Sequence, residues 1–102
     1  MMIYEITAAV RAAMIEKFER FMRDRHIPDL MATGHFKSAE MARISAGNYR
    51  IRYLATDRGV LEEYFHNHGE RLRRDFTENF PDGVEISRQI LEVLEVWPKE
   101  PA

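Results

Sequence analysis

The chain has 102 residues, of which 45% are hydrophobic, 11% aromatic and 31% charged, and its formal net charge is −2. This length suits one hydrophobic core, and the apolar content together with the small net charge excludes a disordered chain. The absence of cysteine excludes a disulfide scaffold, thiolate catalysis and cysteine-ligated metal sites, while the lack of a basic excess argues against nucleic-acid binding.

The chain begins with a predicted strand and helix. Residues 2–10 are apolar and partly β-branched, with one charge at Glu5, which is typical of a buried strand. From Arg11 the apolar residues recur every three or four positions, so an amphipathic helix follows. We expect Pro28 to end that helix, because the residue before a proline is disfavoured in the helical region. The apolar positions of the helix are Met14, Ile15, Phe18, Phe21 and Met22.

A second helical turn and two strands come next. Residues 29–33 predict a short helical turn that Gly34 closes. Residues 35–45 and 48–56 read as strands, and the Ala-Gly-Asn sequence at 46–48 indicates a hairpin between them. The second of these strands alternates clearly, with Tyr49, Ile51, Tyr53 and Ala55 on one face.

The last third of the chain predicts another helix and a final strand. Asp57 suits the N-cap of the helix, and Pro81-Asp82-Gly83 forms the turn after it. Residues 84–97 are rich in Ile, Leu and Val and predict one long strand. The apolar stripe of the helix consists of Leu61, Tyr64, Phe65, His68, Leu72 and Phe76.

These elements give the order β-α-β-β-α-β, which predicts an α+β, ferredoxin-like domain. The right-handed crossover rule places the third strand between the first and the second. The result is a four-stranded antiparallel sheet with two helices on one face. We expect a single domain over residues 1–98 and a short C-terminal tail over residues 99–102.

The other face of this sheet has no cover within one chain. It carries Ile3 and Leu54 beside Glu5, Arg50 and Arg52, a mixture too charged for a dry core and too apolar for an ordinary solvent face. A second copy packed face to face would bury the aliphatic side chains and pair Glu5 with an arginine, so we expect a homodimer through the open sheet face. The alternative is a solvated face with cross-strand ion pairs.

Residues 25–36, which contain HIPDLMATGHF, resemble the "HIP…L-A-T-G-x-F" signature of a family of short bacterial proteins of unknown function. That family belongs to the dimeric α+β barrel superfamily. The chain departs from the family pattern at Gly69-Glu70, directly before Arg-Leu-Arg. Other segments that carry the resemblance are residues 3–5, 49–53, 71–73 and 88–93.

The resemblance implies the fold and a dimer, without implying an activity. The superfamily includes cofactor-free monooxygenases, lactone isomerases, haem-degrading enzymes, sugar mutarotases and ligand-sensing domains. Function therefore has to be argued from the site.

His26 is the candidate for catalysis. It lies where the first helix is expected to break, and its ring can be directed over the sheet toward Tyr4, Tyr49 or Tyr53. An imidazole in such a partly apolar pocket acts as a general base near neutral pH. The alternative is that His26 caps the last carbonyls of the helix.

The other histidines carry weaker signals. His68, on the apolar stripe, either orients a ligand or is a core histidine with one hydrogen bond. His66 and His68 lie two residues apart and face different sides of a helix, and His35 starts a strand, so we expect no metal site.

Tyr4, Tyr49 and Tyr53 either line a pocket or pack as core residues whose hydroxyls find partners. Arg50 and Arg52 either bind an anion or pair with Glu5 and its neighbours.

Three hypotheses for function remain. The first is a homodimer that binds a small molecule in a helix–sheet pocket lined by Tyr4, His26, Tyr49, Tyr53 and His68, without a cofactor. The second is a cofactor-independent enzyme, an oxygenase or isomerase, with His26 as the base. The third is a structural dimer without a ligand. Because neither a signal peptide nor an apolar run of ~18 residues is recognisable, we expect a cytoplasmic protein without a membrane partner.

Overall fold

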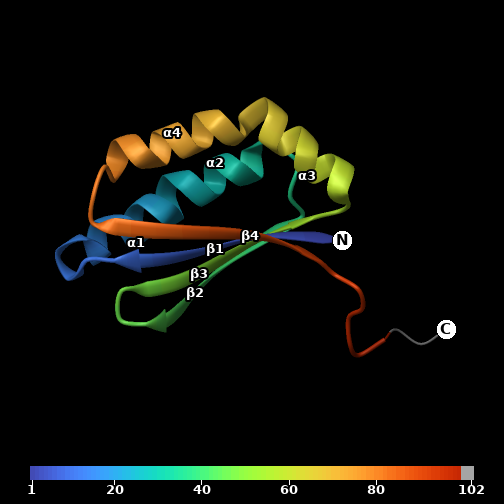
Figure 1. The fold of residues 1–102 in the computed structure, drawn as a ribbon, viewed down its shortest axis with the longest axis horizontal. Helices are drawn as coiled ribbons and strands as arrows, with labels where there is room; N and C mark the ends of the chain where they lie inside the picture. The colour runs from blue at the N-terminus through green and yellow to red at the C-terminus, as the bar shows by residue number, and fades with distance from the viewer. Residues whose placement is uncertain (100–102) are drawn as a thin grey trace.

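The computed structural model describes residues 1–99, and it has the predicted β-α-β-β-α-β order (Figure 1). The strands are β1 (Met2–Val10), β2 (Ser38–Ser45), β3 (Asn48–Ala55) and β4 (Val84–Glu92). The helical segments are η1 (Ala12–Met14), α1 (Ile15–Phe21), η2 (Met22–His26), α2 (Ile27–Ala32), α3 (Arg58–Tyr64), η3 (Phe65–Gly69) and α4 (Glu70–Asn79).

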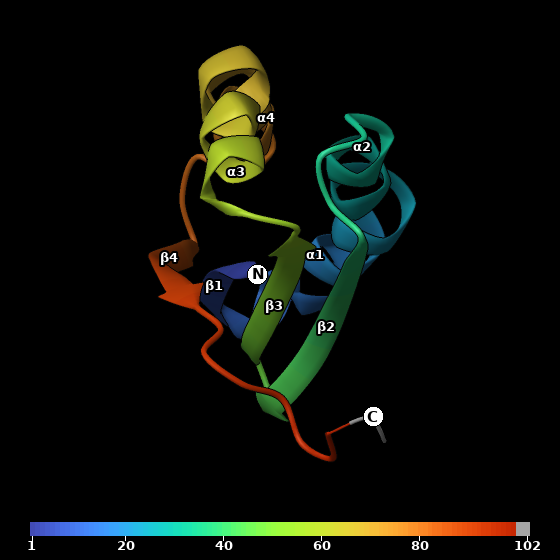
Figure 2. The ribbon, with the colours of Figure 1, turned by 90° about the vertical axis from the view of Figure 1, so that its right-hand side faces the viewer.

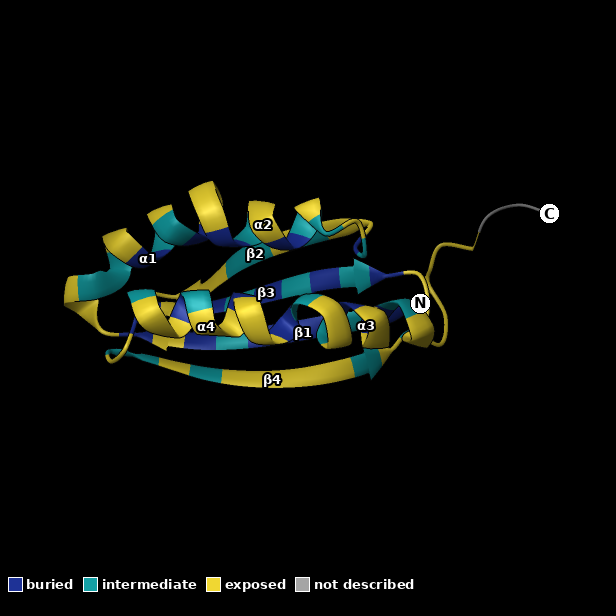
Figure 3. Cartoon of the chain, turned by 90° about the horizontal axis from the view of Figure 1, so that it is seen from above, coloured by how far each residue is buried: buried dark blue, intermediate teal, exposed yellow. Residues whose placement is uncertain are grey.

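The four strands form one antiparallel sheet in the order β2-β3-β1-β4, so the third strand lies between the first two as predicted. Two helical stretches, η1 to α2 and α3 to α4, lie side by side over the same face of the sheet (Figure 2). Seen from the helix side, exposed residues follow the outer surface of the helices and buried residues follow the central strands (Figure 3). The opposite face has no cover among the described residues.

The core lies between the helices and the sheet because the central strands alternate in burial. Tyr49, Ile51 and Tyr53 are at most 1% exposed, and the residues between them are half-buried. Phe18 and Leu61, at most 1% exposed, are among the helix residues of this core. The alternation thus assigned the helix-facing side of β3 correctly.

The first helical stretch continues through Pro28, so the prediction that it ends there is wrong. Within η2 the turn widens, and the amide of Ile27 donates to the carbonyl of Met22, five residues back. Pro28 then lies in the first turn of α2, which follows the widened turn directly. The extra residue rotates the side chains that follow by about 100° around the helix axis.

Two predicted strand limits are also wrong, and both errors have the same cause. The strand expected from His35 starts at Ser38, which pairs with Leu54 near the end of β3. The strand expected to reach Trp97 ends at Glu92, opposite Met2. Beyond these points the neighbouring strand has ended, so the ladder has no partner to continue. Residues 100–102 of the predicted tail lie outside the described residues.

The uncovered face of the sheet holds a buried carboxylate. Glu5 is 6% exposed, because the side chains of Arg52 and Gln89 cover it from the strands on either side. Arg52 Nε donates to one carboxylate oxygen at 2.8 Å, and Gln89 Nε2 donates to the other at 3.1 Å. The ion pair expected for Glu5 therefore forms across two strands of one chain.

Candidate functional site

Two of the predicted site residues, Tyr4 and Tyr53, meet at the centre of the helix–sheet interface. Their rings stack at 5.9 Å, and Tyr64 from α3 lies 6.3 Å from Tyr4. The Tyr4 hydroxyl accepts a hydrogen bond from Arg88 Nε at 3.1 Å. The Tyr53 hydroxyl is buried without a hydrogen-bond partner among the described residues, and burial raises the pKa of this phenol.

His26 packs among phenylalanines, away from this tyrosine group. Its ring stacks on Phe21 at 5.6 Å and meets Phe76 at 5.5 Å. The expectation that His26 caps a helix end is wrong, because η2 leads directly into α2. The residue is 7% exposed, and burial lowers the pKa of its imidazole to about 4, with nearby Asp75 opposing the shift.

A small cavity of about 20 Å³ adjoins His26, with Arg88 in its wall. Such a volume is enough for about one water molecule. The His26 Nδ1 atom is buried and has no partner in the described part of the chain. At neutral pH the imidazole is therefore uncharged and enclosed, and its hydrogen-bonding capacity is only partly used. The remaining lining residues are Ile6, Phe18, Met22, Ile51, Phe76 and Ile86.

Tyr49 contributes to a different place, a groove between the first helical stretch and β2. Its hydroxyl donates to Glu19 Oε2 at 2.5 Å, and Arg43 Nη2 donates to the same oxygen at 2.9 Å. Arg23 reaches the other carboxylate oxygen at 3.2 Å. These contacts, that from Tyr49 first, hold the pKa of the Glu19 carboxyl below its ordinary value.

The groove beside Glu19 has a volume of about 440 Å³, within the usual range of ligand sites. Its floor and walls are mostly apolar, and the charged residues described above line it as well. The apolar lining residues are Ile27, Pro28, Met31 and Met41.

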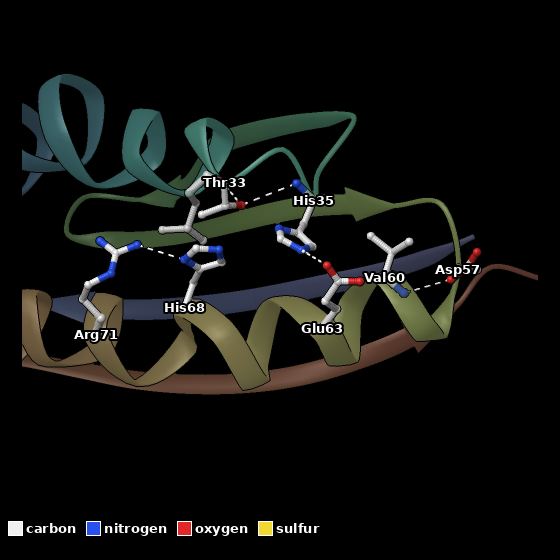
Figure 4. Close-up of polar contacts among 8 residues, drawn as sticks. Thr33, His35, Asp57, Val60, Glu63, His68 and Arg71 are labelled. Atoms are coloured by element: carbon white, nitrogen blue, oxygen red, sulfur yellow. Dashed lines mark hydrogen bonds and ion pairs between the residues drawn. The ribbon is translucent and has the colours of Figure 1, made fainter.

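His68 lies at the opposite end of the helices and faces His35, which sequence analysis had set aside (Figure 4). The two ring centroids are 5.4 Å apart, and the ring of Tyr64 lies 6.3 Å from each. His35 Nε2 contacts Glu63 Oε1 at 3.2 Å, and His68 Nδ1 contacts Arg71 Nη2 at 3.1 Å. The His35 Nδ1 atom is buried without a partner among residues 1–99.

The five predicted residues therefore do not share one pocket. Tyr4 and Tyr53 meet, His26 and Tyr49 lie in separate places, and His68 borders the group through Tyr64. Sequence reasoning missed Glu19, His35 and Arg88. The strand period offers a signal for Arg88, because Ile86 and Ile90 flank it on the helix-facing side of β4.

Among the described residues, no group of three or more histidines and carboxylates is arranged to hold a metal ion. In the same part of the chain, no helix has the length and apolar character needed to span a bilayer.

Comparison with known proteins gives a family and a fold. The family described as "Domain of unknown function (DUF4286)" matches residues 1–94. No curated protein matches the sequence.

Several solved structures have the same fold. A variant of SnoaB, a cofactor-independent oxygenase from Streptomyces nogalater, is 10% identical with a TM-score of 0.74, and the match covers 96% of this chain and 98% of that chain. An EthD family protein from Bacillus halodurans is 15% identical with a TM-score of 0.72, and the match covers 92% of this chain and 100% of that chain. A dimeric ferredoxin-like protein from an uncultured marine organism is 13% identical with a TM-score of 0.66, covering 93% and 96%. At such identities the likeness shows the fold alone.

Proposed function

Given that this chain belongs to DUF4286, a family of unknown function, we propose that it is a homodimer that binds a small amphipathic molecule. The binding site is the groove between the first helical stretch and the sheet edge at β2. The observation that carries this proposal is the groove itself, which has a volume of about 440 Å³ and is lined by apolar walls and a fixed charged cluster.

The charged cluster indicates which ligand chemistry the groove accepts. The Glu19 carboxylate already accepts hydrogen bonds from Tyr49 and Arg43 and pairs with Arg23. The two arginines are more than half exposed and keep further N–H groups free to donate. An acceptor group such as a carboxylate would bind these donors while an apolar body lies against Met31 and Met41.

Titration of the ¹⁵N-labelled chain with decanoate, followed by amide chemical shifts, tests this site. We expect saturable shifts at the groove and about tenfold weaker binding in Arg43→Ala, the loss of one charge-assisted hydrogen bond. Arg20→Ala is the matched control, because Arg20 pairs with Glu16 outside the groove. Shifts without saturation, or equal binding in both variants, would refute the assignment.

The homodimer is supported by apolar surface that one chain leaves exposed. On the open sheet face, Ile3, Leu54 and Leu91 are only half-buried around Glu5. The chain beyond β4 extends away from the sheet (Figure 1), and three of its large hydrophobic residues are more than half exposed. These are Leu94, Val96 and Trp97. Covering such surface is the usual role of a second copy.

Sedimentation equilibrium of the full chain and of Leu54→Asp tests the sheet face as the contact. The face-to-face arrangement predicts a dimer for the wild type and a folded monomer for the variant, because the substitution would bury a carboxylate in the contact between the two copies. A dimer that persists in Leu54→Asp would place the contact elsewhere. We also propose a cytoplasmic location, which suits a chain without cysteine.

Nothing in the geometry favours His26 as a catalytic base. A general base is most effective when its pKa lies near the working pH, whereas burial lowers the pKa of His26 to about 4. The adjoining cavity of about 20 Å³ also has no room for a substrate. Small-molecule binding in the groove therefore has more support than catalysis at His26.

A further inference from the structure

The open face of the sheet is hollowed at one end. A hollow of about 290 Å³ lies over β1, β2 and β3, near the start of β1. Ile3, Leu54 and Ser38 form one row of its walls, because Leu54 pairs with Ile3 on one side and with Ser38 on the other. Glu40 and Arg52, which also pair, form the next row. The remaining lining residues are Ala39 and Tyr53.

The walls of the hollow are apolar on one side and polar on the other. Ile3 and Leu54 are half-buried and offer aliphatic surface. The Glu40 side chain is 59% exposed, and its Oε1 atom lies 3.7 Å from Arg50 Nη2, which is longer than a hydrogen bond. The Glu40 carboxylate is therefore free to accept a hydrogen bond from an occupant. A tryptophan side chain matches these walls, because it has a large apolar body and a single N–H donor.

The chain beyond β4 carries such a side chain. The backbone N–H of Val93 donates to the carbonyl of Met1 at 2.8 Å, so the chain is still tied to the sheet at the end where the hollow lies. We call residues 94–97, which follow, the arm. In Figures 1 and 2 the arm lies on the side of the sheet opposite the helices. Its exposed hydrophobic residues are Leu94, Val96 and Trp97, at 89%, 58% and 71%.

The arm does not fill the hollow of its own chain. Trp97 is 71% exposed, and the walls of the hollow come from β1, β2 and β3 alone. The arm and the hollow nevertheless lie on the same side of the sheet, which is the side of the homodimer contact proposed above. A two-fold symmetric contact is reciprocal, so each copy presents both an arm and a hollow to the other. A second copy of this chain therefore supplies the matching occupant twice.

We propose that the arm of each copy crosses to the open sheet face of the other copy and places Trp97 in the hollow there. The indole body lies against Ile3 and Leu54 of the receiving copy, and Trp97 Nε1–H donates to its Glu40 carboxylate. This inference rests on the homodimer of the proposed function, and it names the side chains that hold the two copies together.

Trp97 is the only tryptophan in the chain, so its fluorescence reports on the arm directly. The full chain is diluted in steps, and sedimentation equilibrium gives the dimer content at each concentration. In the dimer we expect blue-shifted emission and protection from acrylamide quenching, both of which are lost on dilution to the monomer. A dimer whose Trp97 is quenched as readily as in the monomer would overturn the arm contact and leave the homodimer standing, whereas a monomer at every concentration would overturn both.

Isotope-filtered NOE spectroscopy on a mixture of ¹³C-labelled and unlabelled chain identifies which copy holds the arm. We expect NOEs from the Trp97 ring of one copy to the methyl groups of Ile3 and Leu54 in the other. NOEs confined to one chain, or directed to a different surface of the second copy, would overturn the proposal.

The dissociation constant of the dimer provides the matched comparison of variants. Trp97→Ala should raise it about thirtyfold, the loss expected for a buried aromatic anchor in an interface. The variant should stay folded, because Trp97 lies outside the core of its own chain. Lys99→Ala is the control, since Lys99 follows the arm and its side chain is 63% exposed. Equal dissociation constants in the two variants would overturn the role of Trp97.

Discussion

Replacing His26 by leucine should remove a defined part of the pH dependence of stability. His26 is 7% exposed, and burial lowers the pKa of its imidazole from 6.5 to about 4. Because the folded-state pKa lies below the unfolded one, the unfolded chain binds more protons between these pH values. Stability is therefore full above about pH 6.5 and falls as the pH drops toward about 4.

The size of the effect follows from the shift. Each pKa unit corresponds to about 1.4 kcal/mol, so His26 accounts for a loss of about 3 kcal/mol in the free energy of unfolding across that interval. His26→Leu should show a pH dependence that is smaller by this amount. At pH 7.5 the variant should match the wild type within about 1 kcal/mol, because it removes a buried nitrogen without a described partner while filling similar space.

Urea unfolding at fixed protein concentration, followed by circular dichroism from pH 4 to 7.5, measures the difference. A fixed concentration matters because a dimer links stability to mass action. His66→Leu is the control, since this exposed histidine lies outside the core. If His26→Leu keeps the full wild-type pH dependence, then His26 takes up protons in the folded state and the argument from burial is wrong.

Four further substitutions, each followed by urea unfolding, test two glycines, one helix cap and the open sheet face. Gly47→Ala should lower the free energy of unfolding by about 2 kcal/mol and Gly34→Ala by about 1 kcal/mol. Both glycines have a positive φ, but only at Gly47 would a Cβ lie 2.8 Å from a backbone oxygen, that of Val10. Equal losses in the two variants would contradict the steric reason. Asp57→Ala should lose about 1 kcal/mol with the N-cap bond to the α3 backbone, and an unchanged midpoint would show that the cap is dispensable. Glu5→Ala should cost about 2 kcal/mol, since two donors lose a buried carboxylate; a cost near zero would mean that water replaces it fully.

Most of the fold could be predicted from the strand pattern, because the alternation of residues in β1 and β3 depends only on which face of the sheet is buried. The helix limits were less predictable. The π-turn at η2 lets the chain pass Pro28, and it also changes the direction in which His26 points. A local rule for proline cannot anticipate it, since that rule considers only the residue before the proline.

The candidate site was only partly predictable for the same reason. Tyr4 and Tyr53 are opposite each other in the β1–β3 register, so the strand pattern alone brings them together. The contact between His35 and His68 joins a loop to a helix far along the chain. Such a contact depends on tertiary packing, which neither periodicity nor motif spacing encodes.

Native mass spectrometry of the full chain, purified gently from the cells that produce it, tests the central claim most directly. We expect a dimer that carries a reproducible additional mass, which is lost in Arg43→Ala and retained in Arg20→Ala. A dimer without any bound mass, even after incubation with decanoate, would contradict the binding function, and a monomer would contradict the assembly through the open sheet face.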